Sequence, residues 1–456
     1  MQQTLNQTQL EGFLNQLKDD ESVSETMKPQ PVHTMVGGAH LFQATRLDKI
    51  QQLALNCLNE YCPDADRFYD AIFAENKSAA IKIRPQISKL NSETIELIYQ
   101  RVQTKLNSQP VEDYRIDFED GYGYRSDSEE DAHAIQSAEH VSVAMQNDAL
   151  PPFFGIRIKS LSQQTQKRAI RTLDLFLTNL LQQGTANFPA HFIITIAKVT
   201  HISQITVLSQ ILEAFEQQFK LPANTLTIEI MIETANAIID EHGQNPLRRW
   251  VLSNQPRCTS VVFGTYDYTA QCQITAAYQS HFHTAADFAR HMMQVALANS
   301  PVSICDGITN IMPIGRHRQQ PSLQPSLQPW QASENLDDIV NGWRIHFEQV
   351  YYSLQQGYYQ SWDLHPHQLV ARYAALYTFY FSGLNDATTR LQTFLDRAAQ
   401  ASLSGTTFDD AATGQGLLNF FIRGYRCGAL GENEITAAGL KVEDLLTRSF
   451  AEIVGL

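Results

Sequence analysis

Short apolar segments and amphipathic segments alternate along most of the chain. Residues 191–199, HFIITIAKV, form an unbroken apolar run typical of a parallel strand that is buried on both faces. Residues 167–184 instead repeat apolar positions every three to four residues, as a helix with one buried side does, and Gly184 is suited to end that helix. The recurrence of this strand-then-helix unit predicts an α/β fold with parallel strands.

Eight segments fit the strand pattern, and polar turns or helical patterns separate them. In chain order they are residues 31–38, 111–121, 152–160, 191–199, 225–234, 259–269, 301–308 and 358–366. A further strand-like run at 79–85 lies within a long first connection. The pattern therefore predicts a (β/α)8 TIM barrel with an inserted segment after the first strand.

The same pattern divides the chain into three parts. Residues 1–30 are polar and Gln-rich, and we interpret them as a lead-in to the barrel. Residues 31–368 carry the eight strands and form the expected TIM-barrel catalytic domain. Residues 369–456 look helical throughout, so we expect a C-terminal helical extension packed on the barrel.

Composition narrows the class of protein. A chain of 456 residues accommodates a barrel of about 250 residues with additions. The net charge is −14 and no basic stripe is present, which argues against a nucleic-acid partner. No run approaches the roughly 20 apolar residues of a membrane helix. The six cysteines show no CxxC spacing, and no signal peptide is evident, so we expect reduced thiols and a cytoplasmic location.

Two predicted strands lead into carboxylates. Glu233 ends the fifth strand and Asp267 follows the sixth, 34 residues later. The carboxyl ends of parallel barrel strands meet at one rim, so both side chains are expected at the same mouth. Acidic residues also occur at such turns because they stabilise the following helix or pair with an Arg. Because both fall at the same end of adjacent strands, we favour a site for a hard divalent cation such as Mg²⁺.

An acidic turn follows the second strand and faces the same rim. Asp117, Glu119 and Asp120 place three carboxylates within four residues. A solvated turn is the competing interpretation. Crowded carboxylates repel one another unless a cation or a water network offsets them, and crowding raises pKa values into a catalytic range. We therefore expect this turn either to hold the metal ligands in position without binding the metal itself, or to relay protons.

Three further polar residues lie near strand ends. Arg157 is flanked by Ile156 and Ile158, so it is expected to point into the barrel interior or its mouth, where its planar fork suits a carboxylate. Lys198 follows the fourth strand, either as the charge partner of a rim acid or as a Schiff-base nucleophile. His365 lies at the end of the eighth strand, where it either transfers protons or orients the loop.

Seven motifs in this order resemble those of the HpcH/HpaI aldolase and citrate lyase beta-subunit superfamily, over roughly residues 31–370. In chain order they are an acidic turn (Asp117, Glu119, Asp120), Arg157, Lys198, I-E-T (232–234), G-x-x-D-Y (264–268), D-G (306–307) and H-P-x-Q (365–368). Asp120 stands where the pyruvate-type aldolases carry a His, which brings the chain closer to the citrate-lyase branch. The resemblance implies a TIM barrel of the phosphoenolpyruvate/pyruvate type.

The resemblance also implies a cofactor and a class of reaction. Glu233 and Asp267 would be ligands of Mg²⁺ (or Mn²⁺), and Arg157 would bind the carboxylate or carbonyl of a small anionic substrate. A 2-oxo acid or an acyl-CoA thioester fits that description. Together the metal and Arg157 would stabilise an enolate while a carbon–carbon bond forms or breaks, as in an aldolase or citrate lyase-like enzyme.

Roles for the remaining residues follow from the same resemblance. The expected catalytic residues are Arg157, Asp120 and His365, and the expected substrate-binding residues are Arg157, Lys198, Gly264, Asp117 and Glu119. Asp120, His365 and a metal-bound hydroxide all remain open as the general base. The alternatives are Mg²⁺-dependent phosphoryl transfer on phosphoenolpyruvate or pyruvate, a Schiff-base aldolase acting through Lys198, and a non-catalytic ligand-binding barrel. Members of the superfamily often assemble, so a homo-oligomer is compatible with the resemblance.

Overall fold

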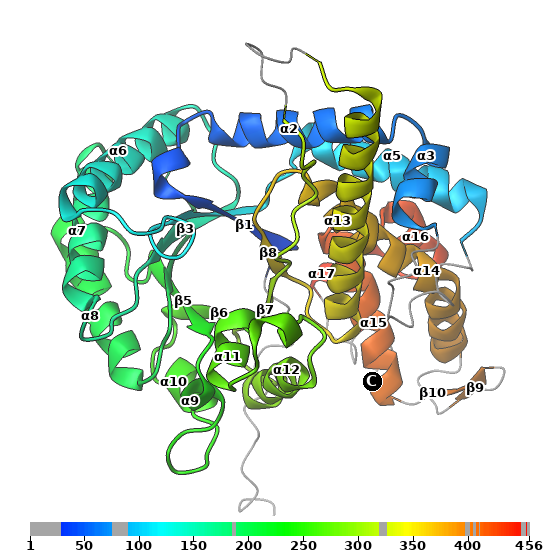
Figure 1. Ribbon diagram of the computed structural model, residues 1–456. Coiled ribbons are helices and arrows are strands. Elements are labelled where there is room, and N and C mark those ends of the chain that lie inside the picture. The colour runs from blue at the N-terminus through cyan, green and yellow to red at the C-terminus, as the bar shows by residue number, and fades with distance from the viewer. Residues whose placement is uncertain are drawn as a thin grey trace, which may run out of the picture.

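The centre of the molecule is a closed barrel of eight parallel strands (Figure 1). A computed structural model describes residues 29–74, 90–184, 188–318, 326–396, 402–404, 407–409, 411–447 and 453. The strands are β1 His33–Gly38, β2 Asp113–Asp117, β3 Phe153–Ile158, β4 His191–Ile196, β5 Leu226–Ile232, β6 Cys258–Phe263, β7 Ser303–Ile308 and β8 Ser361–Asp363. Each strand pairs with the next, and β1 pairs with β8 to close the barrel. The predicted TIM barrel and all eight predicted strands are confirmed.

Helices surround the barrel and connect its strands (Figure 1). They are α2 Arg46–Tyr61, α6 Asp127–Gln146, α7 Gln166–Gln182, α8 Ile202–Phe219, α9 Ala235–Ile238, α10 Leu247–Leu252, α11 Thr265–Gln271, α12 Thr284–Leu297 and α13 Pro329–Gln355; two short 3-10 helices are η1 Ala39–Leu41 and η2 Ala276–Tyr278. Local sequence determines where several of these helices begin. Ser126, for example, forms a reciprocal capping box with Glu129 at the start of α6, which satisfies backbone N–H groups that the helix leaves unpaired.

The segment inserted between β1 and β2 is largely helical. It adds α3 Ala65–Ile72 and α5 Ser92–Ser108 to α2. Helix α3 packs on α13, and α5 packs on α14, so the insert packs on the two helices that precede and follow β8. The strand-like run at 79–85 lies outside the described residues. The predicted insert after the first strand is otherwise confirmed.

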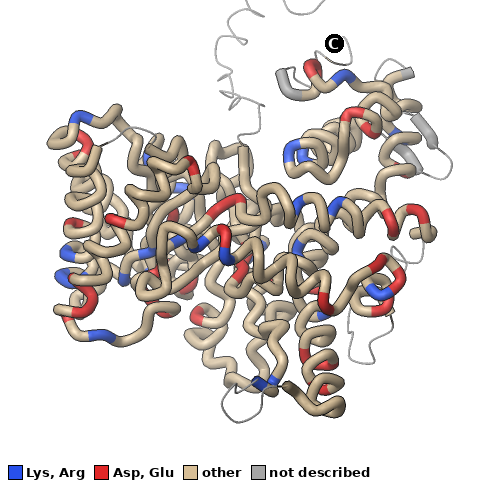
Figure 2. The backbone as a smooth tube through the Cα atoms, turned by 90° about the horizontal axis from the view of Figure 1, so that it is seen from above, with Lys and Arg blue, Asp and Glu red and all other residues tan. Residues whose placement is uncertain are grey.

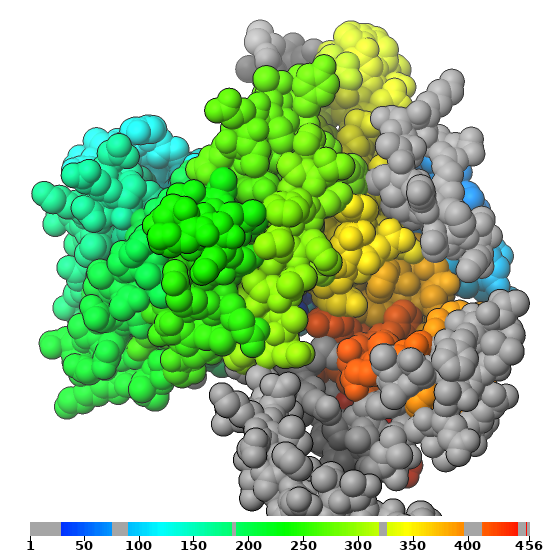
Figure 3. All heavy atoms as spheres, turned by 90° about the horizontal axis from the view of Figure 1, so that it is seen from below, coloured from blue at the N-terminus to red at the C-terminus, as the bar shows by residue number. Residues whose placement is uncertain are grey.

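The C-terminal extension packs beside the barrel (Figure 3). It comprises α14 Gln368–Asp396, β9 Ser402–Ser404, β10 Thr407–Asp409, α15 Ala411–Arg426, α16 Glu432–Ala437 and α17 Val442–Thr447. Strands β9 and β10 pair antiparallel, so the expectation of helix throughout residues 369–456 is wrong at this point. The segment between α14 and α15 is rich in Ser and Thr and contains Gly405, residues that favour a turn over a helix.

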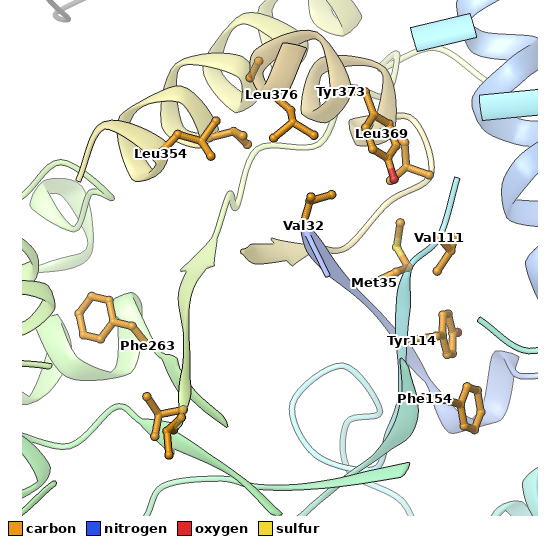
Figure 4. Packing of buried hydrophobic residues seen from close by; sticks show 14 of the residues in the cluster. Val32, Met35, Val111, Tyr114, Phe154, Phe263, Leu354, Leu369, Tyr373 and Leu376 are labelled. Carbon is orange, nitrogen blue, oxygen red and sulfur yellow. The ribbon is translucent and has the colours of Figure 1, made fainter. Parts of the chain in front are cut away.

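Apolar packing forms one large core between the strands and the helices. Figure 4 shows Val32, which directly precedes β1, and Met35, which lies within β1. Leu369, Tyr373 and Leu376 of α14 pack nearby. A second, smaller cluster fills the barrel itself and includes Val36, Ala197, Met231, Val262, Cys305 and Trp362. Because this cluster fills the interior, the barrel is a packed scaffold that fixes the strand ends at its rim.

A polar layer lies deeper in the barrel. Arg115 forms an ion pair with Asp113, and its Nε donates to Thr195 Oγ1 at 3.1 Å. Glu229 accepts hydrogen bonds from Thr195 at 2.8 Å and from Ser260 at 3.0 Å. All five residues are buried, so this network satisfies charges that would otherwise be costly inside the barrel.

Charged residues of both signs are spread over the described part of the chain (Figure 2). Basic and acidic residues are interspersed along the backbone, without a stripe of one sign (Figure 2). No helix in this part of the chain combines the length and the apolar character needed to cross a bilayer.

Candidate active site

A cavity of about 430 Å³ opens at the carboxyl-terminal rim of the barrel. Six residues of the site predicted from sequence line it, namely Asp117, Asp120, Arg157, Glu233, Gly264 and Asp267. This volume falls within the range of about 300–1,000 Å³ that is usual for small-molecule sites. The parallel strands thus deliver side chains that are far apart in the sequence to one pocket, as the barrel predicts.

Glu233 and Asp267 form the acidic part of the cavity. Glu233 follows β5 and is only 1% exposed, whereas Asp267 lies in the first turn of α11 and is half-exposed. The backbone N–H of Lys198 donates to Glu233 Oε1 at 2.6 Å and fixes the orientation of this carboxyl group. Burial and the neighbouring charge of Asp267 raise the pKa of Glu233 to about 8. A cation bound between the two carboxyl groups would stabilise the ionised form of Glu233.

The donor set fits a magnesium-like ion. Glu233 and Asp267 supply hard carboxylate oxygens from adjacent elements. Among the described residues, no group of three or more His, Cys, Asp and Glu side chains could hold a metal. Mg²⁺ is commonly held by one or two carboxylates, with water and substrate as the other ligands. Two protein carboxylates facing a cavity therefore suffice for Mg²⁺, but not for a structural zinc site.

Arg157 is held rigidly by Asp117. The two residues pair directly across β2 and β3, and Nε and Nη2 of Arg157 donate to the two carboxylate oxygens of Asp117, each at 2.6 Å. The guanidinium also lies 5.2 Å from the ring centroid of Trp362. Asp117 accepts backbone N–H bonds from Glu119 and Gly121, which shapes the acidic turn. Asp117 is therefore a brace for Arg157 and the turn, with its oxygens already engaged.

One nitrogen of Arg157 remains less committed. Its Nη1 lies 3.4 Å from Glu119 Oε2 and 3.6 Å from the sulfur of Met231, a residue of the cavity wall. Despite burial, the charge of Asp117 raises the pKa of Arg157, so the guanidinium stays ionised. This nitrogen is the donor that a bound oxyanion would meet.

Lys198 bridges the acids of the rim. Its Nζ donates to Glu119 Oε1 at 2.6 Å and Asp120 Oδ1 at 3.1 Å, and it lies 3.9 Å from Asp267 Oδ1. Despite burial, the hydrogen bond and charge of Glu119 raise the pKa of Lys198. Its backbone adopts a left-handed φ of 52°, a conformation that costs a non-glycine residue about 1–3 kcal/mol. This geometry favours the charge-partner interpretation over a neutral amine nucleophile.

Asp120 differs from its neighbour Glu119. Burial raises the pKa of Glu119. Burial opposes ionisation of Asp120 as well, but its hydrogen bond with Glu119 and the charges of Arg157 and Lys198 lower its pKa. Asp120 lines the cavity, and its side chain is 57% exposed. It is therefore an ionised carboxylate within reach of a bound molecule.

His365 is the predicted catalytic residue that the structure does not bring to the cavity. Its neighbour Leu364 lines the wall instead. The rings of His365 and His367 lie 4.5 Å apart, and His365 Nδ1 accepts the backbone N–H of His367 at 3.2 Å. Burial, together with His367 and Arg46, lowers the pKa of His365 to about 4. The loop-orienting interpretation fits this placement.

Sequence reasoning missed several residues of the cavity wall, including Arg46, Met231, Tyr266 and Trp362. Arg46 begins the helix after β1, and such a βα loop reaches the same rim as Glu233, which was an available signal. Met231 and Trp362 lie within strands, where the sequence pattern does not distinguish cavity residues from core residues.

Asp306 of the predicted D-G motif does not line the cavity. It is fully buried and accepts a hydrogen bond from Arg290 Nε at 2.8 Å, so it braces β7.

A family model and several solved structures match this chain. The sequence model of a family described as "Domain of unknown function (DUF6986)" matches residues 20–453. A citrate lyase from Burkholderia xenovorans LB400 is 15% identical with a TM-score of 0.50, over 76% of this chain and 92% of that one. This likeness shows a shared TIM-barrel fold. No curated protein matches the chain.

Malate synthase from Haloferax volcanii is also structurally similar, at a lower score. Its magnesium/glyoxylate complex is 13% identical with a TM-score of 0.45, over 94% of this chain and 97% of that one. Its pyruvate/acetyl-CoA ternary complex is 15% identical with a TM-score of 0.44, over 96% and 98%.

Proposed function

The chain belongs to the DUF6986 family, and from this premise we propose that it is a divalent-metal-dependent carbon–carbon lyase or aldolase. It would act through an enolate on a small 2-oxo acid or an acyl thioester. The observation that carries the proposal is the buried carboxyl of Glu233, which shares one cavity with Asp267 and a braced Arg157. The citrate lyase that shares the fold is compatible with this class of chemistry.

The cavity supplies the electrostatics that an enolate needs. Mg²⁺ or Mn²⁺ held by Glu233 and Asp267 would polarise a carbonyl oxygen of the substrate. Arg157 binds the developing negative charge through Nη1, while Asp117 and Trp362 hold its guanidinium in place beforehand. A donor fixed in this way needs no reorganisation during the reaction, and loss of one such donor costs about 10²–10³ in rate.

We assign proton transfer to Asp120. Of the candidate side chains, Asp120 lines the cavity whereas His365 does not. Lys198 and Arg157 keep Asp120 ionised, so it has a lone pair available at pH 7. Lys198 holds the acidic turn through hydrogen bonds to Glu119 and Asp120 and takes no covalent part in the proposed reaction.

Two measurements together test the proposal. Isothermal titration with Mg²⁺ compares the wild type with Glu233→Gln and Asp267→Asn, and Glu213→Gln on the exposed face of α8 is the matched control. Proton NMR in D₂O then follows exchange at C3 of pyruvate, which reports enolate formation directly. The proposal expects Mg²⁺ binding and Mg²⁺-dependent exchange that both site variants lose. Equal Mg²⁺ affinity in all four proteins would overturn it.

A further inference from the structure

A second arginine lines the cavity, on the wall that lies across the barrel from Glu233. Arg46 is the first residue of α2, directly after the β1 loop, and it lines the cavity together with Gly37 and Leu41. In a closed barrel of eight strands in sequential order, β1 lies across from β5. Arg46 therefore faces the Glu233 side of the cavity from the far wall.

The two cavity arginines differ in their partners. Arg157 is engaged by both oxygens of Asp117 and approached by Glu119. Arg46 forms no ion pair with an acid in the described part of the chain, and its Nε has no hydrogen-bond partner. Arg46 interacts with the buried Tyr114 hydroxyl through a hydrogen bond and its charge, and with His365 through its charge, and neither group supplies a carboxylate. A half-buried guanidinium without a counter-ion is costly, and a bound anion removes that cost.

The cavity acids fall into two groups. Glu233 and Asp267 follow β5 and β6, across the barrel from Arg46, whereas Asp117 and Asp120 lie at the end of β2, next to β1, and are already engaged by Arg157 and Lys198. A substrate with one oxygen-bearing end at the carboxylate pair would present its other end towards Arg46. A methyl group at that end would leave the guanidinium unpaired.

We propose that Arg46 binds a second anionic group of the substrate, so that the site selects a dianion over a monoanion of the same length. This inference rests on the proposed function and specifies its substrate class. The chemistry is an anionic oxygen group paired with a guanidinium. Its source is either the distal carboxylate of a 2-oxo diacid or a phosphate of a coenzyme A thioester, and the assay separates the two.

The test uses ligands that differ only in the distal group. 2-Oxoglutarate and 2-oxovalerate have the same chain length, with a carboxylate in one and a methyl in the other. Coenzyme A and 3′-dephospho-coenzyme A, which lacks only the distal phosphate, form the corresponding phosphate pair. Dissociation constants are measured by titration calorimetry, with and without Mg²⁺, for the wild type, Arg46→Met and Arg46→Lys. Lys49→Met is the matched control, since it removes a positive charge from the exposed face of the same helix, outside the cavity.

The expected result is a preference of about tenfold to a hundredfold for the anionic member of one pair, because a charge-assisted hydrogen bond contributes that much to affinity. Arg46→Met loses this preference, Arg46→Lys keeps part of it, and Lys49→Met keeps it fully. A preference confined to 2-oxoglutarate or to coenzyme A supports the inference and identifies the source. Equal preferences in the wild type and Arg46→Met, or no preference in the wild type, would overturn it.

Failure of the inference is distinguishable from failure of the proposed function. If Arg46→Met leaves ligand preference unchanged while Mg²⁺-dependent exchange on pyruvate continues, only the assignment of Arg46 is wrong. If the wild type shows no exchange on pyruvate, the enolate chemistry is wrong, and the titrations without Mg²⁺ still decide whether Arg46 binds an anion.

Discussion

Gly264 leaves space for the side chain of Glu233, and a methyl group in that space should weaken the proposed metal site. A Cβ added at Gly264 would lie 2.4 Å from Cβ and 2.7 Å from Oε2 of Glu233. Carbon atoms in contact prefer a separation of about 3.5–4.0 Å, so Glu233 must move by about 1 Å to accommodate the methyl group. The backbone of Gly264, with φ −98° and ψ 84°, lies outside the left-handed region, so the clash itself dominates the effect.

The displaced carboxylate should bind Mg²⁺ less well. Disturbing the support of a metal ligand typically costs about tenfold to a hundredfold in affinity, and a shift of about 1 Å in a reacting group costs about a hundredfold in rate. We therefore expect Gly264→Ala to raise the Mg²⁺ dissociation constant by roughly tenfold to a hundredfold in titration calorimetry.

The control is Gly416→Ala on the exposed face of α15, where an added Cβ meets no atom within 4 Å. Gly416→Ala should leave Mg²⁺ affinity unchanged. If Gly264→Ala folds normally by circular dichroism and binds Mg²⁺ as the wild type does, Glu233 is not a metal ligand held against Gly264, and the reasoning fails.

Three further results are expected. Asp117→Asn breaks a buried, bidentate ion pair and should lower the free energy of unfolding by about 3–5 kcal/mol in urea titrations, against little change for the exposed Asp48→Asn; similar losses would contradict the bracing role of Asp117. Despite burial, Arg290 holds the pKa of Asp306 well below its usual range. The contribution of this ion pair to the stability of the fold is therefore complete above the unfolded-state pKa of about 3.9, and it is lost progressively as the pH falls below that value. Asp306→Asn should therefore flatten the fall of Tm between about pH 5 and pH 3, and an unchanged slope would refute this assignment. Borohydride added with pyruvate should leave Lys198 unmodified in peptide mass spectra, because Glu119 keeps its amine protonated; an adduct at Lys198 would support a Schiff-base aldolase.

The barrel was predictable because burial imposes a simple pattern on parallel strands. Strands such as β4 are covered on both faces, so almost every residue is apolar, and the amphipathic helices between them are equally distinct. The acids at strand ends stood out against these runs. Glu233, Asp267 and Arg157 could therefore be assigned to one rim from the order of elements alone.

Other features depend on contacts that sequence spacing does not encode. The engagement of Arg157 by Asp117 requires the register between β2 and β3, which the structure gives as a direct pairing. The position of His365 depends on which residue of the β8 loop faces inward, and that residue is Leu364. Arg46 resembles any Arg at a helix start until the cavity is seen. The hairpin of β9 and β10 lies in a segment rich in Ser and Thr, where neither the alternation of a strand nor the three-to-four-residue repeat of a helix is strong.

We propose above that Glu233 and Asp267 hold a divalent cation that serves enolate formation. Proton NMR of pyruvate in D₂O tests it most directly, with the wild type and Glu233→Gln compared at saturating Mg²⁺ and in EDTA. We predict loss of the C3 proton signal only for the wild type with Mg²⁺. Exchange that persists in EDTA, or that Glu233→Gln catalyses as fast as the wild type, would contradict the claim.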